Sequence, residues 1–284
     1  MSSVRRLLVS VAAAFSIETA PAQDAVSPEL DPPFSGMAEV GVADKYIYHG
    51  YVLENQGAII QPYLEVSAQF YSREHFLTKA SFRLAVFSSF QLHESRDEEA
   101  EAMIRSWYEL QVEAGIVLEF AKRFTFSASY VRFESPNSAF IASNGAEFVL
   151  AIDDSDWLGA FALHPHVTWF RPFPGGWESS DEGSYFELGI EPEHSFGKSE
   201  RPPTVSFPIT VGFGQKRYYF GEHFGFFSTG VAVSVPLTFI PPSLGEWSLG
   251  ASATYYRLGR NAAEFSNDGE RNVTLFAATV GTQF

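Results

Sequence analysis

The sequence predicts an all-β protein, a transmembrane antiparallel up-and-down β-barrel of about twelve strands. Three observations predict this fold. Apolar and polar residues alternate along most of the chain, long and short connections take turns between the alternating segments, and aromatic residues gather near the segment ends. Alternation indicates strands whose two faces lie in different environments. Loop asymmetry combined with aromatic girdles is typical of barrels in the outer membrane of Gram-negative bacteria.

The composition excludes several other classes of protein. Of the 284 residues, 45% are hydrophobic and 19% are charged, against about 25% charged residues in an ordinary soluble domain. No stretch reaches the roughly 20 consecutive apolar residues that a membrane helix needs. The chain has no Cys, which excludes disulfides and thiolate metal sites. The net charge of −15 argues against nucleic acid as a partner, because phosphates repel an acidic surface.

The N-terminus has the layout of a secretory signal peptide. Arg5 and Arg6 precede the apolar run Leu7–Ile17, and Ala20 and Ala22 are small residues at the positions that a signal peptidase reads. We therefore expect residues 1–22 to be the signal peptide, 23–34 a flexible periplasmic tail and 35–284 the barrel. The alternative is an amphipathic helix at the start of the mature fold.

Alternation predicts the strands in order along the chain. It is clearest after Ser106, where Leu110 and Val112 fall on one face and Glu109 and Glu113 on the other. Val112 is expected to touch lipid and Glu113 to face the lumen. The predicted strands are 35–52, 57–71, 76–91, 103–120, 124–134, 145–152, 157–172, 183–196, 204–219, 225–239, 247–258 and 271–284.

The connections divide into a short and a long class. With one exception near Leu53–Gln56, the odd-numbered connections are the longer ones, and acidic Leu92–Ala102 is an example that we expect to be extracellular. Aromatic residues lie beside both classes of connection. A soluble two-sheet sandwich also alternates, but it does not need aromatic residues at both ends of nearly every strand.

The last strand ends on an aromatic residue. Phe276, Val280 and Phe284 lie on one face of the expected 271–284 strand. A terminal Phe on an amphipathic strand resembles the signal that outer-membrane proteins present to the barrel-assembly machinery, and the alternative is an ordinary edge strand that ends on Phe by chance. Besides that machinery, the expected partners are outer-membrane lipid and lipopolysaccharide.

The polar faces of the strands are expected to line the lumen, where glutamates outnumber basic residues. Two interpretations stay open: the charges fill and stiffen a narrow barrel, or they form the wall of a hydrated pore that prefers cations. Arg83 and Glu113 are expected to face each other across the 76–91/103–120 hairpin. The candidate lumen-lining residues are Glu39, Lys45, Glu65, Lys79, Arg83, Glu109, Glu113, Glu119, Glu187, Glu191 and Glu193.

Two other patterns contain residue types that can carry chemistry. His164 and His166 share one face of the expected 157–172 strand, but no partner ligand stands at a useful spacing, so lumen-lining histidines are favoured over a metal site. Ser143-Asn144-Gly145 matches part of the motif of outer-membrane phospholipase A, with Ile141 at the position of the base. A serine without a base is a poor nucleophile. No catalytic residue, cofactor or metal is expected.

The first predicted hairpin carries a family resemblance. Its stretch Val40–Leu53 includes Tyr46, Tyr48, His49 and Gly50, and it resembles the opening strand of TorF-like putative porins, in which Arg-Gly stands where this chain has His49-Gly50. The resemblance covers about residues 36–70 and the closing strand, and it implies a bacterial outer-membrane barrel with a poorly defined transport role.

These patterns together predict the passive passage of small polar solutes or ions through the barrel, with weak cation selectivity. The main alternative is a structural or adhesive barrel with a plugged lumen. An outer-membrane enzyme that hydrolyses lipids is the third hypothesis.

Overall fold

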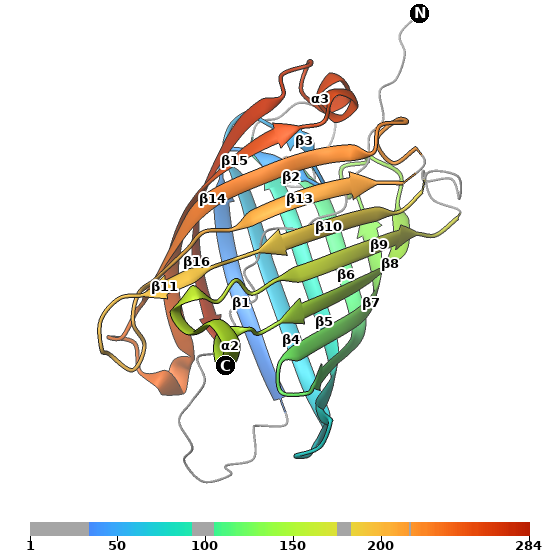
Figure 1. Ribbon diagram of the computed structural model, residues 1–284. Coiled ribbons are helices and arrows are strands. Elements are labelled where there is room, and N and C mark those ends of the chain that lie inside the picture. The colour runs from blue at the N-terminus through green and yellow to red at the C-terminus, as the bar shows by residue number, and fades with distance from the viewer. Residues whose placement is uncertain (1–33, 93–104, 175–182, 216) are drawn as a thin grey trace, which may run out of the picture.

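The computed structural model describes residues 34–92, 105–174, 183–215 and 217–284. The chain forms a closed antiparallel barrel of twelve strands (Figure 1), which confirms the predicted fold class. Two of the twelve are each interrupted, so they carry two labels. The wall consists of β1 (Phe34–Ala43), β4 (Ile59–Ser72), β5 (Leu77–Gln91), β6 (Trp107–Phe120), β7 (Phe124–Glu134), β8 (Ser143–Ile152), β9 (His166–Pro172), β10 (Tyr185–Ile190) with β11 (Glu193–Ser195), β12 (Thr204–Ser206) with β13 (Ile209–Gly214), β14 (Phe224–Pro236), β15 (Glu246–Leu258) and β16 (Asn272–Gln283).

The first and last strands close the barrel. β1 pairs with β4 on one side and with β16 on the other, so that Val40 stands opposite both Pro62 and Val280. Closure gives each wall strand except the three-residue β11 a partner on both sides, and this satisfies most of the backbone hydrogen-bonding groups without water. The sheet therefore meets the main requirement for crossing a bilayer.

Prolines interrupt the two divided strands. Pro192 separates β10 from β11, and Pro208 lies between β12 and β13. Proline has no N–H to give to a neighbouring strand, so the ladder breaks at both positions. The chain still holds together there, because the Phe207 N–H donates to the Pro192 carbonyl oxygen at 2.9 Å.

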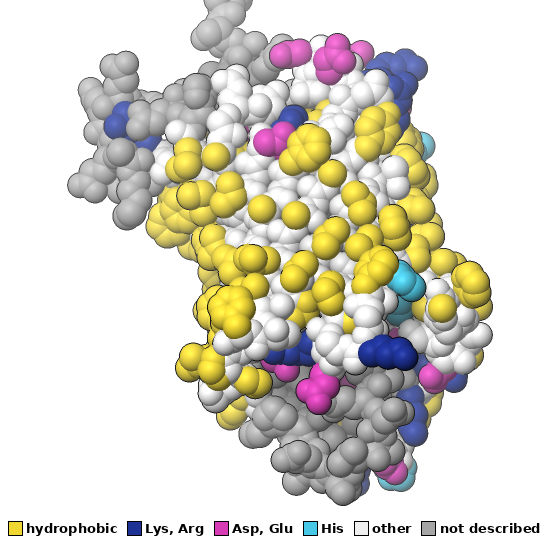
Figure 2. Space-filling model, turned by 90° about the vertical axis from the view of Figure 1, so that its left-hand side faces the viewer, with side chains coloured by type: hydrophobic (Ala, Val, Ile, Leu, Met, Phe, Trp, Pro, Cys, Tyr) yellow, Lys and Arg dark blue, Asp and Glu magenta, His cyan; other side chains and the backbone are white. Residues whose placement is uncertain are grey.

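The outer surface is a broad apolar belt. Val40, Leu64, Leu84 and Val233 have 38% to 52% of their surface exposed, and Figure 2 shows hydrophobic side chains spread over the middle of one face with charged residues above and below. A closed sheet with such a belt lies in a lipid bilayer. The protein is therefore an outer-membrane β-barrel, as the sequence predicted.

Aromatic rings mark both ends of the belt. Phe120 and Phe124 stack at 5.3 Å between ring centroids near the short connection from β6 to β7, and Phe90 and Trp107 stack at 5.5 Å beside the long connection from β5 to β6. Such girdles occupy the two lipid–water interfaces of outer-membrane barrels. Separately, none of the helices in the described ranges is long and apolar enough to cross a membrane.

The predicted strand 35–52 is wrong beyond Ala43. The wall strand β1 ends there, and the chain turns into a separate hairpin of β2 (Tyr46–Tyr48) and β3 (Tyr51–Glu54). His49 and Gly50 form its turn with φ angles of 44° and 79°, a backbone region that glycine adopts freely. The connection from β1 to β4 is therefore long, and the one apparent exception to the loop pattern disappears.

The predicted strand 157–172 is also wrong at its start. Residues 155–161 form the helical turns α2 (Ser155–Leu158) and η1 (Gly159–Phe161), and β9 begins only at His166. The buried Asp154 carboxylate accepts backbone hydrogen bonds from Leu163 and His164 at 3.0 to 3.1 Å. These bonds satisfy the backbone within the loop instead of in the sheet.

Two further predictions fall largely outside the described residues. The proposed signal peptide and nearly all of the tail lie in residues 1–33, and the acidic connection Leu92–Ala102 is described only at Leu92.

The alternation on β14 predicts a contrast between neighbouring substitutions. Val231 faces outward with 39% exposure, whereas Ala232 is on the enclosed face opposite Ser252. We expect Val231→Arg to lower the free energy of unfolding by about 2–4 kcal/mol, because the charge enters the bilayer near its middle. Ala232→Arg places the charge among small residues inside and should leave stability near that of the wild type. Urea titration in lipid vesicles measures both, and equal destabilisation would contradict the register.

Candidate functional site

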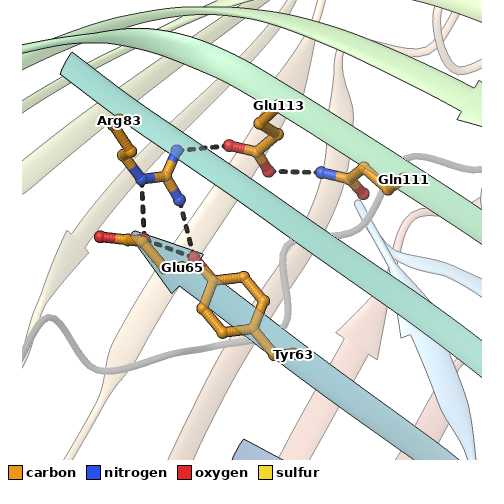
Figure 3. A network of polar contacts seen from close by, with 5 residues as sticks. All are labelled: Tyr63, Glu65, Arg83, Gln111 and Glu113. Carbon is orange, nitrogen blue, oxygen red and sulfur yellow. Dashed lines mark hydrogen bonds and ion pairs between the residues drawn. The ribbon is translucent and has the colours of Figure 1, made fainter. Parts of the chain in front are cut away.

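A network of polar side chains joins three neighbouring wall strands on the enclosed face of the barrel (Figure 3). The Arg83 guanidinium on β5 donates to Glu65 on β4 at 2.7 Å and to Glu113 on β6 at 2.5 Å. It also donates to the Tyr63 hydroxyl at 2.8 Å. The contact predicted between Arg83 and Glu113 is present, and Glu65 is a second carboxylate on the same guanidinium.

Small neighbours make room for this network. Ala85 stands directly between Glu65 and Glu113 in register, and Gly115 stands beside Arg83. Alternation directs the side chains of Glu65, Arg83, Ala85 and Glu113 to the enclosed face. With nothing larger than a methyl group on Ala85, the long Arg83 side chain reaches both carboxylates.

The acidic wall continues around the barrel through Glu147 on β8 and Glu187 on β10. Glu147 lies near enough to Glu113, Arg83 and Glu187 to interact with them electrostatically, and Tyr185 donates a hydrogen bond to Glu187. Sequence analysis missed Glu147, although its place between Ala146 and Phe148 in an alternating strand was a usable signal. Three glutamates, Glu65, Glu113 and Glu147, thus interact with the Arg83 cation, and Glu187 extends the acidic wall beyond them.

The other candidate lumen residues are spread along the barrel. Lys79 and Glu119 lie 3.8 Å apart near the short connections. Lys45 follows β1 and pairs with Asp44 at 2.6 Å, so the structure places it in the connection to the hairpin. Glu39 is half-buried on β1, Glu191 follows β10, and Glu193 is exposed on β11.

The β2–β3 hairpin packs inside the barrel at the end that bears the long connections. Tyr46, Tyr48, Tyr51 and Val52 have 2% to 5% of their surface exposed. The hydrophobic core of the molecule is built around them, with wall residues such as Phe87 and Phe226. Sequence analysis missed this packing. The available signal was the run of apolar residues on both faces of 46–52, which does not suit a wall strand that borders lipid and lumen.

Specific hydrogen bonds hold the hairpin in place. The Tyr46 hydroxyl donates to Glu109 of β6 at 3.1 Å, and Glu109 is fully buried beneath the hairpin. The Tyr219 hydroxyl donates to the His49 carbonyl oxygen at 2.7 Å. Ser266, in α3 (Arg260–Ser266), accepts a hydrogen bond from the Val52 N–H at 3.0 Å. The hairpin is thus tied to β6 and to two other long connections.

The imidazole of His49, at the hairpin turn, lies between two tyrosine rings. Its centroid is 3.6 Å from that of Tyr48 and 3.5 Å from that of Tyr185, with the Tyr185 ring tilted by 17°. Nδ1 is 2.5 Å from the Tyr218 hydroxyl oxygen, and Nε2 has no hydrogen-bond partner in the part of the chain that is described. Burial lowers the pKa of His49 well below its usual value.

The two histidines that share a predicted face do not share one in the structure. His164 lies in the loop before β9 with a positive φ, and its Nδ1 is 4.0 Å from Asp153, whereas His166 begins β9. Among the described residues no three histidine or acidic side chains gather as metal ligands would. Ser143 is buried at the start of β8, opposite Phe133 of β7 in register.

The proposed assembly signal lies on the last strand. Phe276 and Val280 face outward from β16 with 56% and 37% of their surface exposed, and Phe284 follows the strand with 59% exposed. Phe284 also exchanges two backbone hydrogen bonds with Gly36. The terminal residue thus takes part in closing the barrel.

Comparison with known proteins gives distant structural similarities. No protein-family model matches the chain, and no curated protein matches it. The NanC porin is 12% identical over 87% of this chain and 98% of its own, with a TM-score of 0.44. An outer-membrane channel from Pseudomonas putida F1 is 11% identical over 92% of this chain and 100% of its own, with a TM-score of 0.45. Such likeness does not assign a solute.

The buried imidazole predicts a pH dependence of hairpin docking. Because docking lowers the His49 pKa below its free value of about 6.5, the docked hairpin binds fewer protons than the released one. Docking should therefore be strongest above that value and weaken as the pH falls through and below it. Tyr48, Tyr185, Tyr218 and Phe170 surround the ring.

Hydrogen exchange of the 46–54 amides, corrected for intrinsic rates, measures this dependence. We expect protection to fall between pH 7.5 and pH 5.5 in the wild type, across the ordinary His range near 6.5. In His49→Gln the pH dependence should vanish. An unchanged acid response in that variant would assign the effect to another group.

Proposed function

We propose that the protein is a porin-like channel for passive diffusion of small polar solutes or ions, with weak cation selectivity. The acidic wall at the level of Arg83 carries this proposal. Glu65 and Glu113 bind that guanidinium, Glu147 interacts with it electrostatically, and Glu187 lies near Glu147. Fixed negative charge in a narrow, partly dehydrated passage attracts cations and repels anions.

The opposite side of the barrel supports a hydrated path. On β14, β15 and β16 the enclosed face carries the small and only partly buried residues Ala232, Ser234, Gly250, Ser252, Ala277 and Thr279. Short side chains leave width between this sector and the acidic wall. The solutes that suit the passage are small, because Arg83 and its carboxylate partners still project into the barrel when the hairpin is released.

A structural barrel with a plugged lumen remains the rival function, and the buried hairpin favours it. Under our proposal the hairpin must leave its site for solutes to pass, whereas under the rival it never does. The two functions therefore differ in one physical event, the release of residues 46–54.

Several sequence-based expectations belong to the same proposal. Residues 1–22 would direct export, 23–34 would form a periplasmic tail, and Phe276, Val280 and Phe284 would engage the barrel-assembly machinery. The long connections would then face outward, toward lipopolysaccharide. The Tyr46, Tyr48 and Gly50 pattern supports a relationship with TorF-like putative porins, and all eleven candidate lumen residues remain proposed as lining the passage.

Reversal potentials across a planar bilayer with a salt gradient test the selectivity. We expect potassium to be favoured over chloride, and Glu65→Gln to lower that preference by about twofold, because it removes one charge from the passage. Glu134→Gln is the matched control: Glu134 is on the outer face of β7, where it pairs with Arg132 at 2.6 Å. An anion-selective channel, or an equal effect of both variants, would contradict the proposal, and a silent barrel would favour the rival.

A further inference from the structure

The His49 side chain, at the turn of the β2–β3 hairpin, lies among aromatic residues of the wall and its connections. Tyr185 on β10 stacks on one face of the His49 ring, Phe170 on β9 lies 6.0 Å away between centroids, and Tyr218 lies at 5.9 Å. We call Tyr185, Phe170 and Tyr218 the aromatic box. Tyr48 covers the other face of the imidazole, but it belongs to the hairpin and would leave with it.

The box belongs to the wall and its connections, whereas the imidazole belongs to a loop. Phe170 and Tyr185 are opposite each other in register and almost fully buried, so the sheet holds them whether or not the hairpin is docked. His49 occupies the box as a ligand would: a flat ring stacked at 3.5 Å with one nitrogen beside a hydroxyl at 2.5 Å.

His49 fits the box incompletely. Its Nε2 is buried and has no hydrogen-bond partner among the described residues, which costs free energy relative to water. Its φ of 44° lies in a region that residues other than glycine adopt at some cost. A free ring would carry neither penalty, because it has no backbone and would orient its second nitrogen toward solvent or a better partner.

We propose that the aromatic box is a binding site for flat nitrogen heterocycles, and that His49 is its built-in occupant, which such a solute displaces. The site deepens the proposed function and rests on it for its role in transport. Tyr185 would stack on the ring and the Tyr218 hydroxyl would bond a ring nitrogen. Glu187, which accepts a hydrogen bond from Tyr185, adds negative charge nearby that tolerates a protonated ring.

Displacement of His49 would couple binding to opening. A solute in the box and the docked hairpin exclude each other, so each weakens the other by the same factor. The solute thereby releases the hairpin that fills the long-connection end of the barrel. The solute would thus raise the fraction of barrels whose hairpin is released, and the channel would conduct more in its presence than in its absence.

Imidazole is the probe for this site, with cyclopentanol as a control ring of the same size that lacks aromaticity and nitrogen. The measurement is hydrogen exchange of the 46–54 amides in the wild-type barrel at pH 8, where the probe is mostly neutral. We expect imidazole to raise their exchange by about threefold or more at saturation, by shifting the docked population. Cyclopentanol should have no effect.

Saturation-transfer NMR gives an independent measure of binding. His49→Gly empties the box, and imidazole should bind it about tenfold more tightly than it binds the wild type, since no occupant competes. Adding Tyr218→Phe to His49→Gly should weaken that binding severalfold, because a hydrogen bond is lost. Heat-modifiable migration in gels verifies that each variant retains the barrel.

The outcomes separate this inference from the proposed function. If imidazole binds His49→Gly but leaves exchange of the wild-type hairpin unchanged, then the substitution has only made a cavity, and the inference is overturned. It is also overturned if cyclopentanol acts as imidazole does, or if neither protein binds imidazole. Binding with hairpin release in a barrel that never conducts would instead contradict the channel function alone.

Discussion

The interior of a closed twelve-stranded barrel has to be filled, and the rest of this structure depends on that constraint. Eight strands enclose a space that their own side chains fill, whereas a larger barrel leaves a lumen. Here the chain fills one end of the lumen with its own hairpin. Tyr48, Tyr51 and Val52 become the centre of a hydrophobic core whose shell is the inner face of the wall. The other face of every wall strand is left to lipid.

As a result, the two ends of the interior differ in packing and in exposure to water. Around the hairpin, aromatic packing and hydrogen bonds from Tyr46 and Tyr219 exclude water. Toward the short connections, the enclosed face carries small residues and partly exposed charges such as Lys79 and Glu119. Arg83 lies between the two regions, where its guanidinium neutralises part of a surplus of carboxylates. Removing that cation would leave Glu65 and Glu113 without their shared partner, and such losses are costly for enclosed ion pairs.

The alternation of apolar and polar residues predicted those features that depend on neighbouring residues and on single hairpins. The segment 124–134 was predicted with the bounds that β7 has, and the contact of Arg83 with Glu113 followed from the register of one hairpin. The box around His49 could not be predicted in this way, because it joins residues more than a hundred positions apart through the closure of the sheet. The strand expected at 157–172 failed because alternation does not reveal that Asp154 accepts the backbone hydrogen bonds of its own loop. Glu147 was missed although it lies on the predicted strand 145–152.

The most direct test of the account is whether the hairpin closes the barrel. The chain has no Cys, so Val52→Cys with Ser266→Cys introduces one possible disulfide. The Val52 N and the Ser266 Oγ are 3.0 Å apart, which keeps the two Cα atoms within the roughly 7 Å that a disulfide spans.

The measurement is the conductance of the oxidised double variant in a planar bilayer before and after a reductant is added, with each single variant as a control. The account predicts that conductance is low when oxidised and rises severalfold on reduction, while the single variants do not respond. Conductance that is the same in the oxidised and reduced protein would contradict it.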